Sequence, residues 1–508
     1  MSQNVSVKGG TMKYFLAFDV GTTAMKCILY DKNFNEVFEC NEEYSLSTPE
    51  NNRVELLADT YFDVFCKNIK KLWENGIKGD DILTLTFTTQ GETLIPVDKD
   101  GNPLLNAIVW LDSRGEKEAE EILGKINIED FYAKTGLPGL DGALPLAKLM
   151  WIKKNCPDIY DNTYKFMLLE DYLIQKLTDE FVTEKSLASS TGWLDIVKGE
   201  YFEELIKACG IDSDKLPGLM DCGKKVSNIS AKASKITGLS EKTMVVTGAM
   251  DQVASAIGAG NTKEGIITET TGTALVLGAT VKKPDLETED RITVYRHFDD
   301  KFLYMPYCPT AGIVLKWFKD NMAGELKQKA KELGVSVYTL IDEEAQKAEP
   351  GCDGVRCLAH FSGKEGIDNA KGVFFGIKLK TKMPELSRSV LEGVSCMLFE
   401  QVENLKKTGI EVKEIYSLGG GSYSDIWTGI KASMCNVSFK RTDIAQSTAL
   451  GAPILGAVAV GEYRNVDEAF SGIKKNVKIT KPDENQKEAY KTVYEEYCRL
   501  YNVLANEF

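Results

Sequence analysis

Histidine is nearly absent from this sequence, since His297 and His360 are the only two among 508 residues. A catalytic triad built on histidine and a zinc site with finger-like cysteine and histidine spacing are therefore excluded. The twelve cysteines are scattered from Cys27 to Cys498 and are too sparse for a disulfide framework. They are expected to be free thiols in a reducing cytoplasm.

Long apolar runs are also missing. The sequence has no run of about 18 apolar residues, the length a membrane span needs, and the N-terminal segment MSQNVSVKGGTMK lacks the pattern of a secretion signal. With 61 Lys and Arg against 75 Asp and Glu, the formal charge of −14 repels phosphate backbones and anionic lipids. We expect a soluble cytoplasmic protein that binds neither nucleic acid nor a membrane.

What is present is the composition of an ordinary globular protein, with 43% hydrophobic and 27% charged residues. At about 150 residues per domain, the length suffices for two to four domains. Apolar runs at Tyr14–Phe18 and Cys27–Tyr30, joined by a Gly/Thr turn, predict a β-hairpin. Helical periodicity at 57–76 and 116–124 flanks a strand predicted at 82–87, so the fold class is α/β.

A similar strand, turn and strand recur about 250 residues later, around Glu269–Ala274. The repetition indicates two related halves with a junction near residues 255–265, unless the likeness is due to chance. Two helical patterns, at 385–407 and 447–460, lie in the second half, and the latter is rich in Ala and Gly.

The turn of the first hairpin has the residues of a phosphate-binding loop. Gly21 lets backbone N–H groups approach an anion closely, Thr22 and Thr23 add hydroxyl donors, and Lys26 supplies a cation. Asp19, at the strand end, can hold Mg²⁺ through water. The loop is not of the G-x-x-x-x-G-K-[ST] type. A plain turn is the alternative interpretation.

Two further turns are rich in glycine. Gly272 is flanked by Thr271 and Thr273, which can surround phosphate oxygens. Three consecutive glycines, Gly419–Gly421, precede a helix expected to begin near Ser424, and they leave room for a flat ring or a ribose at the helix N-terminus. Each turn alone is weak support, but together with the first hairpin they predict a nucleotide site.

Asp251 and Gln252 follow Gly248 at the start of a predicted helix rich in small residues. A carboxylate there can be a helix N-cap. Because the residue lies between the two phosphate turns in the sequence, a general base that accepts the proton of an attacking hydroxyl is the functional interpretation.

Two polar segments suit a polyol. Amide, carboxylate and guanidinium groups match hydroxyl donors and acceptors, and an indole face suits the apolar side of a sugar ring. A solvated loop is the alternative. The candidate substrate-binding residues are Gln90, Gly91, Glu92, Trp110, Asp112 and Arg114.

In this order the motifs DVGTTAMK, TTQGE, VWLDSRG, GAMDQ, TTGTA and GGGSYSDIW resemble the FGGY family of carbohydrate kinases, from about residue 14 to 465. Within the family the xylulose (pentulose) kinases are nearest, with a glycerol-kinase-like run at Asn106–Arg114. The resemblance implies two actin-like (ribonuclease-H-like) domains, 13–258 and 259–508, with ATP in a cleft between them. The first domain would bind the sugar and the second the adenosine.

The resemblance also implies roles for single residues. Asp251 matches the catalytic base, Asp19 and Asp251 would hold Mg²⁺, and Gln252 would contact the sugar. Gly272 and Thr273 match the second phosphate turn, and Gly312, Gly420 and Gly421 match the adenosine side. An Asn that contacts adenine in glycerol kinases is Ser424 here, which puts that contact in doubt.

The segment Thr89–Glu92 departs from both nearest groups, because it lacks the sugar-contacting histidine of xylulose kinases and the arginine of glycerol kinases. We therefore expect an ATP-dependent kinase of a primary sugar hydroxyl, with a pentulose such as xylulose as substrate and glycerol, another alditol, a hexulose or a deoxy sugar as alternatives. An actin- or Hsp70-like ATPase acting on a protein and a catalytically silent sugar sensor are the rivals. The expected partners are a small sugar and ATP, and a homodimer stays open.

Overall fold

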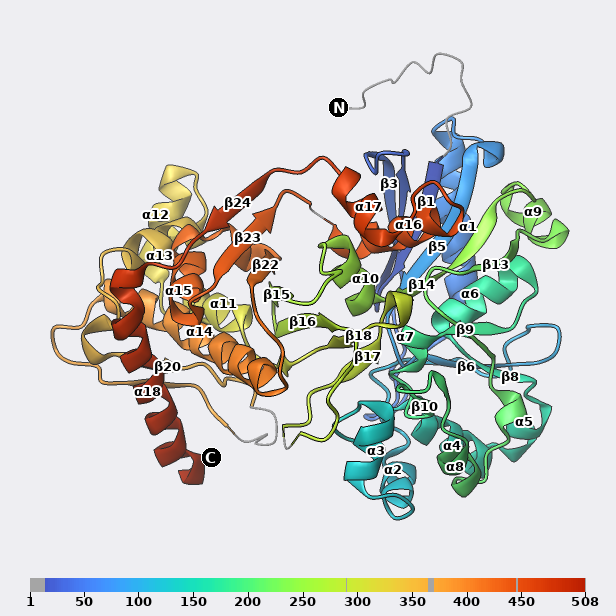
Figure 1. Cartoon of the computed structure of the whole chain (residues 1–508), viewed down its shortest axis with the longest axis horizontal. Coiled ribbons are helices and arrows are strands. Elements are labelled where there is room, and N and C mark those ends of the chain that lie inside the picture. Colours follow the sequence, from blue (N-terminus) through green and yellow to red (C-terminus); the bar gives the residue numbers. More distant parts are fainter. Residues whose placement is uncertain (1–13, 289, 364–369, 445, 508) are drawn as a thin grey trace. The chain divides into compact units, whose positions relative to one another are not determined.

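The structure is a computed structural model that describes residues 14–288, 290–363, 370–444 and 446–507. The polar leader and residue 13, the expected start of the first domain, lie outside the described residues. Strands and helices alternate along the chain, which confirms the α/β class (Figure 1). Among the helices in these ranges, none has the length and apolarity needed to cross a membrane. All twelve cysteines are free thiols, as expected.

The chain divides into two compact units. Unit 1 comprises residues 1–262, 291–303 and 445–474, and unit 2 comprises residues 263–290, 304–444 and 475–508. The first change of unit, between 262 and 263, lies within the expected junction. A single division at 258 and 259 does not separate the units, however, because residues 291–303 and 445–474 belong to unit 1.

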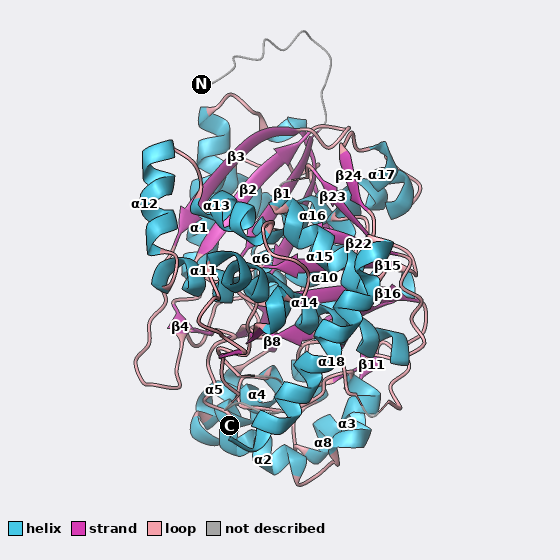
Figure 2. Ribbon diagram, turned by 90° about the vertical axis from the view of Figure 1, so that its left-hand side faces the viewer, coloured by secondary structure: helices cyan, strands magenta, loops and turns pink. Residues whose placement is uncertain are grey.

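A six-stranded sheet forms the centre of unit 1, in the order β13-β14-β5-β1-β2-β3. The predicted hairpin is present, with β1, β2 and β3 antiparallel and side by side (Figure 2). Since β5 runs parallel to β1 and β14, Val20, Thr89 and Met250 end their strands at one edge of the sheet. The strands are β1 (Tyr14–Val20), β2 (Ala24–Tyr30), β3 (Glu36–Glu43), β5 (Ile82–Thr89), β13 (Lys225–Asn228) and β14 (Met244–Met250).

Two helices of unit 1 touch backbone to backbone. A Cβ on Gly258 of α10 (Asp251–Gly258) would lie 1.9 Å from the Ser447 carbonyl oxygen, and one on Gly451 of α16 (Ser447–Ala459) would lie 2.1 Å from the Ala254 carbonyl oxygen. Figure 1 shows the two helices side by side. Helix α16 also packs on β1, β5 and β14. This packing of an apolar helix explains why residues 445–474 belong to unit 1.

The predicted helices at 57–76 and 116–124 correspond to α1 (Asp59–Glu74) and α2 (Glu116–Leu123), and the predicted strand is β5. Helix α1 packs its aromatic side chains on the sheet, where the rings of Phe18 and Phe65 lie 4.6 Å apart. The other elements of unit 1 are β4 (Glu55–Leu56), β6 (Leu94–Val97), β7 (Ala107–Ile108), α3 (Ile128–Thr135), α4 (Pro145–Asn155), α5 (Pro157–Asn162), β8 (Lys165–Leu168), α6 (Leu169–Thr178), β9 (Val182–Glu184), α7 (Lys185–Ala188), β10 (Leu194–Asp195), β11 (Glu200–Tyr201), α8 (Glu203–Ala208), β12 (Gly218–Met220), α9 (Ala231–Thr237), β17 (Val294–Arg296) and α17 (Val466–Gly472).

Unit 2 has a sheet in which β16, β15, β22, β23 and β24 are neighbours in that order. Strands β15 and β22 are parallel, and Thr270 pairs with Leu418, so the two glycine-rich turns follow at the same edge. The predicted helix at 385–407 is α14. The elements are β15 (Ile266–Thr271), β16 (Leu275–Val281), β19 (Tyr307–Cys308), α11 (Gly312–Asn321), α12 (Gly324–Leu333), α13 (Val337–Ala345), β20 (Arg356–Leu358), β21 (Val373–Phe375), α14 (Met383–Lys407), β22 (Glu414–Leu418), α15 (Asp425–Cys435), β23 (Ser438–Thr442), β24 (Val477–Thr480) and α18 (Lys487–Leu504), while β18 (Phe302–Tyr304) spans a change of unit.

Candidate active site

The second predicted phosphate turn joins β15 to β16 in unit 2. The Gly272 N–H donates to the Ala274 carbonyl at 3.0 Å and closes the turn. The Ala311 N–H donates to the Thr273 carbonyl at 2.9 Å, and a Cβ on Gly312 would lie 2.4 Å from the Gly272 carbonyl oxygen. Helix α11 therefore begins directly against the turn, at a position where only glycine fits.

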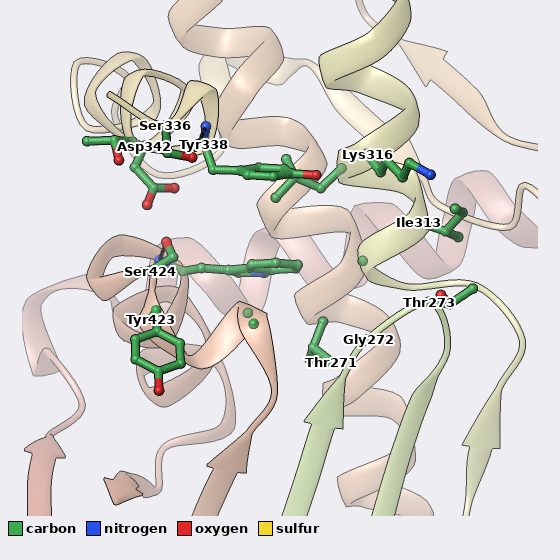
Figure 3. Close-up of a pocket in the computed structure, with 16 residues that line it drawn as sticks. Thr271, Gly272, Thr273, Ile313, Lys316, Ser336, Tyr338, Asp342, Tyr423 and Ser424 are labelled. Carbon is green, nitrogen blue, oxygen red and sulfur yellow. Dashed lines mark hydrogen bonds between the residues drawn. The ribbon is translucent and has the colours of Figure 1, made fainter. Parts of the chain in front are cut away.

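A pocket of about 530 Å³ opens beside this turn. This volume is in the range of small-ligand sites. Seven of its lining residues are among the nucleotide-binding residues predicted from the sequence, and all belong to unit 2. The lining consists of Thr271, Gly272, Thr273, Gly312, Ile313, Leu315, Lys316, Ser336, Tyr338, Thr339, Asp342, Gly420, Gly421, Tyr423, Ser424 and Trp427 (Figure 3).

One wall of the pocket comes from α13 and the residue before it, which the sequence motifs did not indicate. Figure 3 shows Tyr338 and Asp342 on the side opposite Ser424. The Ser424 Oγ accepts from the Trp427 N–H at 3.2 Å and so caps α15, as the sequence predicted for the helix start. Burial raises the pKa of Asp342 to about 6, although the Ser424 hydroxyl lowers it. A short amphipathic helix carries no signal that distinguishes a pocket wall from any other surface.

The first hairpin is in unit 1. The Gly21 N–H donates to the Ala24 carbonyl at 3.0 Å, and the Tyr44 hydroxyl donates to the Gly21 carbonyl. The indole N–H of Trp110 donates to Thr22 Oγ1 at 3.0 Å. This side chain, which is predicted to bind the sugar, therefore contacts the predicted phosphate loop. Thr23 follows in the same turn, where its carbonyl accepts the Tyr44 N–H at 2.9 Å.

Lys26, the predicted cation of this hairpin, is already partnered. Its ammonium donates to Gln446 Oε1 at 3.0 Å and lies 3.6 Å from the Glu39 carboxylate. The contact with Gln446 ties β2 to the segment that carries α16. A phosphate would have to compete with these partners for Lys26.

Asp19 and Asp251 lie near the carboxyl ends of β1 and β14. Burial raises the pKa of Asp251 to about 7, and the Asp19 charge adds to the effect. Burial also raises the pKa of Asp19, while Lys26 lowers it. Met250 is the N-cap of α10 and makes no side-chain cap, so Asp251 is the first helical residue and not its cap.

Asp19 and Asp251 offer a metal ion two carboxylates and no third side-chain ligand of the usual types in the part of the chain that the structure describes. No group of three or more His, Cys, Asp or Glu suited to a metal occurs among the described residues. Mg²⁺ commonly binds one or two carboxylates and takes its remaining ligands from phosphate and water. Asp19 and Asp251, whose charges act on each other, fit that pattern.

Gln90 and Glu92 follow β5 at the same edge of the sheet. The Gln90 N–H donates to the Val20 carbonyl at 3.1 Å, its side chain donates to the Tyr61 hydroxyl at 3.3 Å, and its buried Oε1 has no partner. Glu92 has a φ of +54°, which is unusual for this residue type. Burial raises its pKa to about 7, and the charge of Asp251 contributes.

Lys148 supports the Glu92 loop and was not recognised from the sequence. Its side chain is fully buried and donates to the carbonyls of Glu92 at 3.0 Å and Val109 at 2.9 Å. Burial lowers its pKa to about 8. A lysine within the apolar run Pro145–Ile152 of α4 was the available signal, because a buried ammonium requires such partners.

Asp112 and Arg114 form a salt bridge with each other. Asp112 has no exposed surface, and it accepts from Arg114 Nε at 2.8 Å and from the Val54 N–H at 2.7 Å. Arg114 also pairs with Glu55 at 2.6 Å. These two residues, which were predicted to bind the sugar, therefore hold the loops around Trp110 together in this structure. Asp112 is not accessible to a ligand.

The strand that leads to Asp251 is fixed by residues that the sequence did not indicate. The Gly248 N–H donates to Glu170 Oε1 at 2.7 Å, and the Met250 N–H donates to Ser186 Oγ at 3.0 Å. Tyr295 of β17 is a further neighbour of these carboxylates. Burial is the main cause that raises the pKa of Tyr295, and the charges of Glu92 and Asp251 add to it. Gly91 packs against Ser190, whose Oγ would lie 3.0 Å from an added Cβ, and Gln252 directly follows the candidate base.

The chain is similar in sequence and in structure to several proteins named as sugar kinases. The chain is 27% identical to a gluconokinase of Bacillus subtilis over 97% of both chains, and 25% identical to a xylulose kinase of Staphylococcus xylosus over 97% of this chain and all of the relative. A solved structure of a ligand-bound xylulose kinase from Lactobacillus acidophilus superposes with a TM-score of 0.87 at 25% identity, over 97% of this chain and 99% of the other.

A gluconate kinase structure from the same organism is equally similar, with a TM-score of 0.87 and 25% identity over 97% of this chain and 98% of the other. Residues 14–258 match the N-terminal domain of one family and residues 268–460 its C-terminal domain. The resemblance of the motifs, the two-domain actin-like fold and a sugar phosphotransferase activity are thereby confirmed. The chain belongs to the FGGY family of carbohydrate kinases.

Proposed function

We propose that the protein transfers the γ-phosphate of ATP to a primary hydroxyl of a small neutral sugar, a pentulose such as xylulose. The observation that carries the proposal is the group of polar side chains at one sheet edge of unit 1, where Asp251, Glu92 and Gln90 follow parallel strands. The proposal assigns the nucleotide to the pocket of unit 2, where the two glycine-rich turns meet.

In the proposed reaction Asp251 accepts the proton of the attacking hydroxyl, and the new O–P bond forms as the bond from the γ-phosphorus to the β,γ-bridging oxygen breaks. A carboxylate whose pKa is about 7 is well matched to this transfer near neutral pH. Asp19 and Asp251 would hold Mg²⁺, which supplies charge neutralisation for the phosphates. The turn amides and Thr22 and Thr23 would orient the transferred phosphate.

The charge around the residues proposed to bind the sugar favours a neutral substrate over an acid sugar. Glu92, Asp251 and Asp141 place three carboxylates in this region, and each raises the energy of a further negative charge. The ammonium of Lys148 is the nearby counter-charge, but it donates to two backbone carbonyls. A sugar carboxylate would therefore meet net repulsion, which argues for a neutral substrate although some relatives are named gluconokinases.

A screen of ADP release over ketoses, aldoses, alditols and aldonates tests the proposal. We expect turnover that depends on the sugar, with a pentulose among the better acceptors and gluconate a poor one. Gluconate as the best acceptor would overturn the neutral class. A hexulose, deoxy sugar or alditol as the best acceptor would move the substrate to that class. ATP hydrolysis that no sugar stimulates would favour the actin-like ATPase.

Replacement of Glu92 by alanine is expected to lower kcat/KM for the best sugar about tenfold, equivalent to about 1.4 kcal/mol, and to leave KM for ATP nearly unchanged. A site built to pair hydroxyl groups loses affinity when one partner is removed. Steady-state kinetics with each substrate varied in turn measures both values. Glu92→Gln is the matched variant, because glutamine keeps the length of the side chain and removes its negative charge. A change confined to KM for ATP would remove Glu92 from the sugar site.

Replacement of Asp19 by alanine is expected to raise the Mg²⁺ concentration that gives half-maximal rate and to lower kcat, because one of the two carboxylates proposed to hold the ion is lost. Titration of activity with Mg²⁺ at saturating ATP and sugar provides the measurement. Asp63→Ala, on the exposed side of α1, is the matched control. If kcat and the Mg²⁺ concentration that gives half-maximal rate both equal those of the parent, Asp19 does not hold the metal.

A further inference from the structure

A buried ion pair lies behind the phosphate turn of unit 2. Lys431 of α15 and Glu269 of β15 have no exposed side-chain surface, and the Lys431 ammonium lies 2.9 Å from Glu269 Oε1. The Ser417 hydroxyl donates to the same carboxylate. Burial of two charges is expensive, and apolar residues of similar size often stabilise a fold as well or better. The pair therefore calls for an explanation other than stability.

The pair fixes the direction of one hydroxyl in the turn. The Lys431 ammonium donates to Thr271 Oγ1 at 2.7 Å, and the Thr271 hydroxyl donates to Glu269 Oε2 at 2.7 Å. Since an ammonium can only donate and an ionised carboxylate can only accept, the Thr271 hydroxyl proton must point to Glu269. The Thr271 hydroxyl is therefore directed to Glu269 and not to a ligand, while the residue itself lines the pocket.

Lys431 also contacts the other side of the pocket. Its ammonium lies 4.7 Å from the centroid of the Trp427 ring, and Trp427 lines the pocket. A Cβ on Gly421 would lie 3.1 Å from the Thr271 Cβ, so the third glycine of the triplet rests on the residue that Lys431 holds. One ammonium therefore connects the phosphate turn, the glycine triplet and an aromatic residue of the pocket.

We propose that Lys431 is a positioning residue for the nucleotide. It fixes the Thr271 turn relative to Trp427, so that a polyphosphate on the turn and a base in the pocket are bound together. This inference rests on the proposed assignment of the pocket to ATP. It adds a residue that does not line the pocket, and it gives the buried charge pair a role in binding.

Two variants test the proposal. The double variant Lys431→Met/Glu269→Leu removes both charges, so that neither is left buried alone. Thr271→Val keeps the ion pair and removes the hydroxyl between its partners at nearly the same shape. For each variant, calorimetry measures the dissociation constant of ADP without sugar, thermal unfolding measures Tm, and kinetics gives KM for ATP and for the best sugar.

The expected result is that both variants are folded, that they bind ADP about tenfold more weakly, and that KM for the sugar is unchanged. The Tm of the double variant should be close to that of the parent, whereas Thr271→Val lowers Tm because the buried Lys431 ammonium loses one acceptor. An affinity for ADP equal to that of the parent in either folded variant would overturn the proposal. If the double variant does not fold, Thr271→Val decides alone. A parent that binds ADP but phosphorylates no sugar would overturn the proposed function and leave this inference intact, whereas a parent that binds no ADP would overturn the inference.

Discussion

Replacement of Asp251 by asparagine is expected to lower kcat by about 10²-fold or more, with little change in KM for ATP. Asparagine keeps the shape of the side chain but cannot accept the proton of the attacking hydroxyl. Burial and the Asp19 charge hold the pKa of Asp251 at about 7, which makes the parent carboxylate a competent base. Turnover with the best sugar, measured by ADP release, gives the comparison.

Asp63→Asn is the matched control, because Asp63 is an exposed carboxylate of α1 that the proposed mechanism does not use. We expect this variant to retain nearly the rate of the parent. If Asp251→Asn also turned over at close to the rate of the parent, the base would have to be another group, and Glu92 would be the first to examine.

Replacement of Gly312 by alanine is expected to raise KM for ATP about tenfold or more. The added Cβ would lie 2.4 Å from the Gly272 carbonyl oxygen, and a contact that short forces backbone atoms to move. The phosphate turn is the part that must give way, because Gly312 begins α11 directly beneath it. Kinetics at varied ATP and binding of ADP both measure the effect.

Gly324→Ala is the control for this substitution. Gly324 is also the first residue of a helix in unit 2, and an added Cβ there meets nothing within 4 Å. Its KM for ATP should equal that of the parent. An unchanged KM in Gly312→Ala as well would mean that the phosphate turn does not bind the nucleotide.

The short hairpins and glycine-rich turns could be predicted from the sequence because their signals are local. A turn between two apolar runs defines β1 and β2, and three consecutive glycines define the end of β22. The helices at 385–407 and 447–460 were predicted within two residues at each end, since the first has a long apolar periodicity and the second is a long run of alanine, glycine and other apolar residues. The two turns that contain glycine and threonine also follow β1 and β15 as the sequence predicted, because these residue types mark a tight turn locally. Their role in binding stays a prediction.

The residues that the sequence did not reveal depend on partners far along the chain. Asp112 and Arg114 looked like sugar ligands, yet they pair with each other, and Arg114 also pairs with Glu55. Lys148 takes its partners from two separate loops, and Asp342 faces a pocket completed by α15. No pattern of nearby residues encodes which distant carbonyl or helix a side chain will meet.

The return of α16 to unit 1 also bears on the order in which the protein matures during synthesis. Gly456 packs so closely on β5 that an added Cβ would lie 2.7 Å from the Thr86 hydroxyl oxygen, and the helix covers β1 and β14 as well. A nascent chain that has emerged only to residue 262 therefore has one face of this sheet uncovered. Because unit 2 is translated between the two parts of unit 1, the N-terminal unit can complete its core only after most of the other unit has left the ribosome.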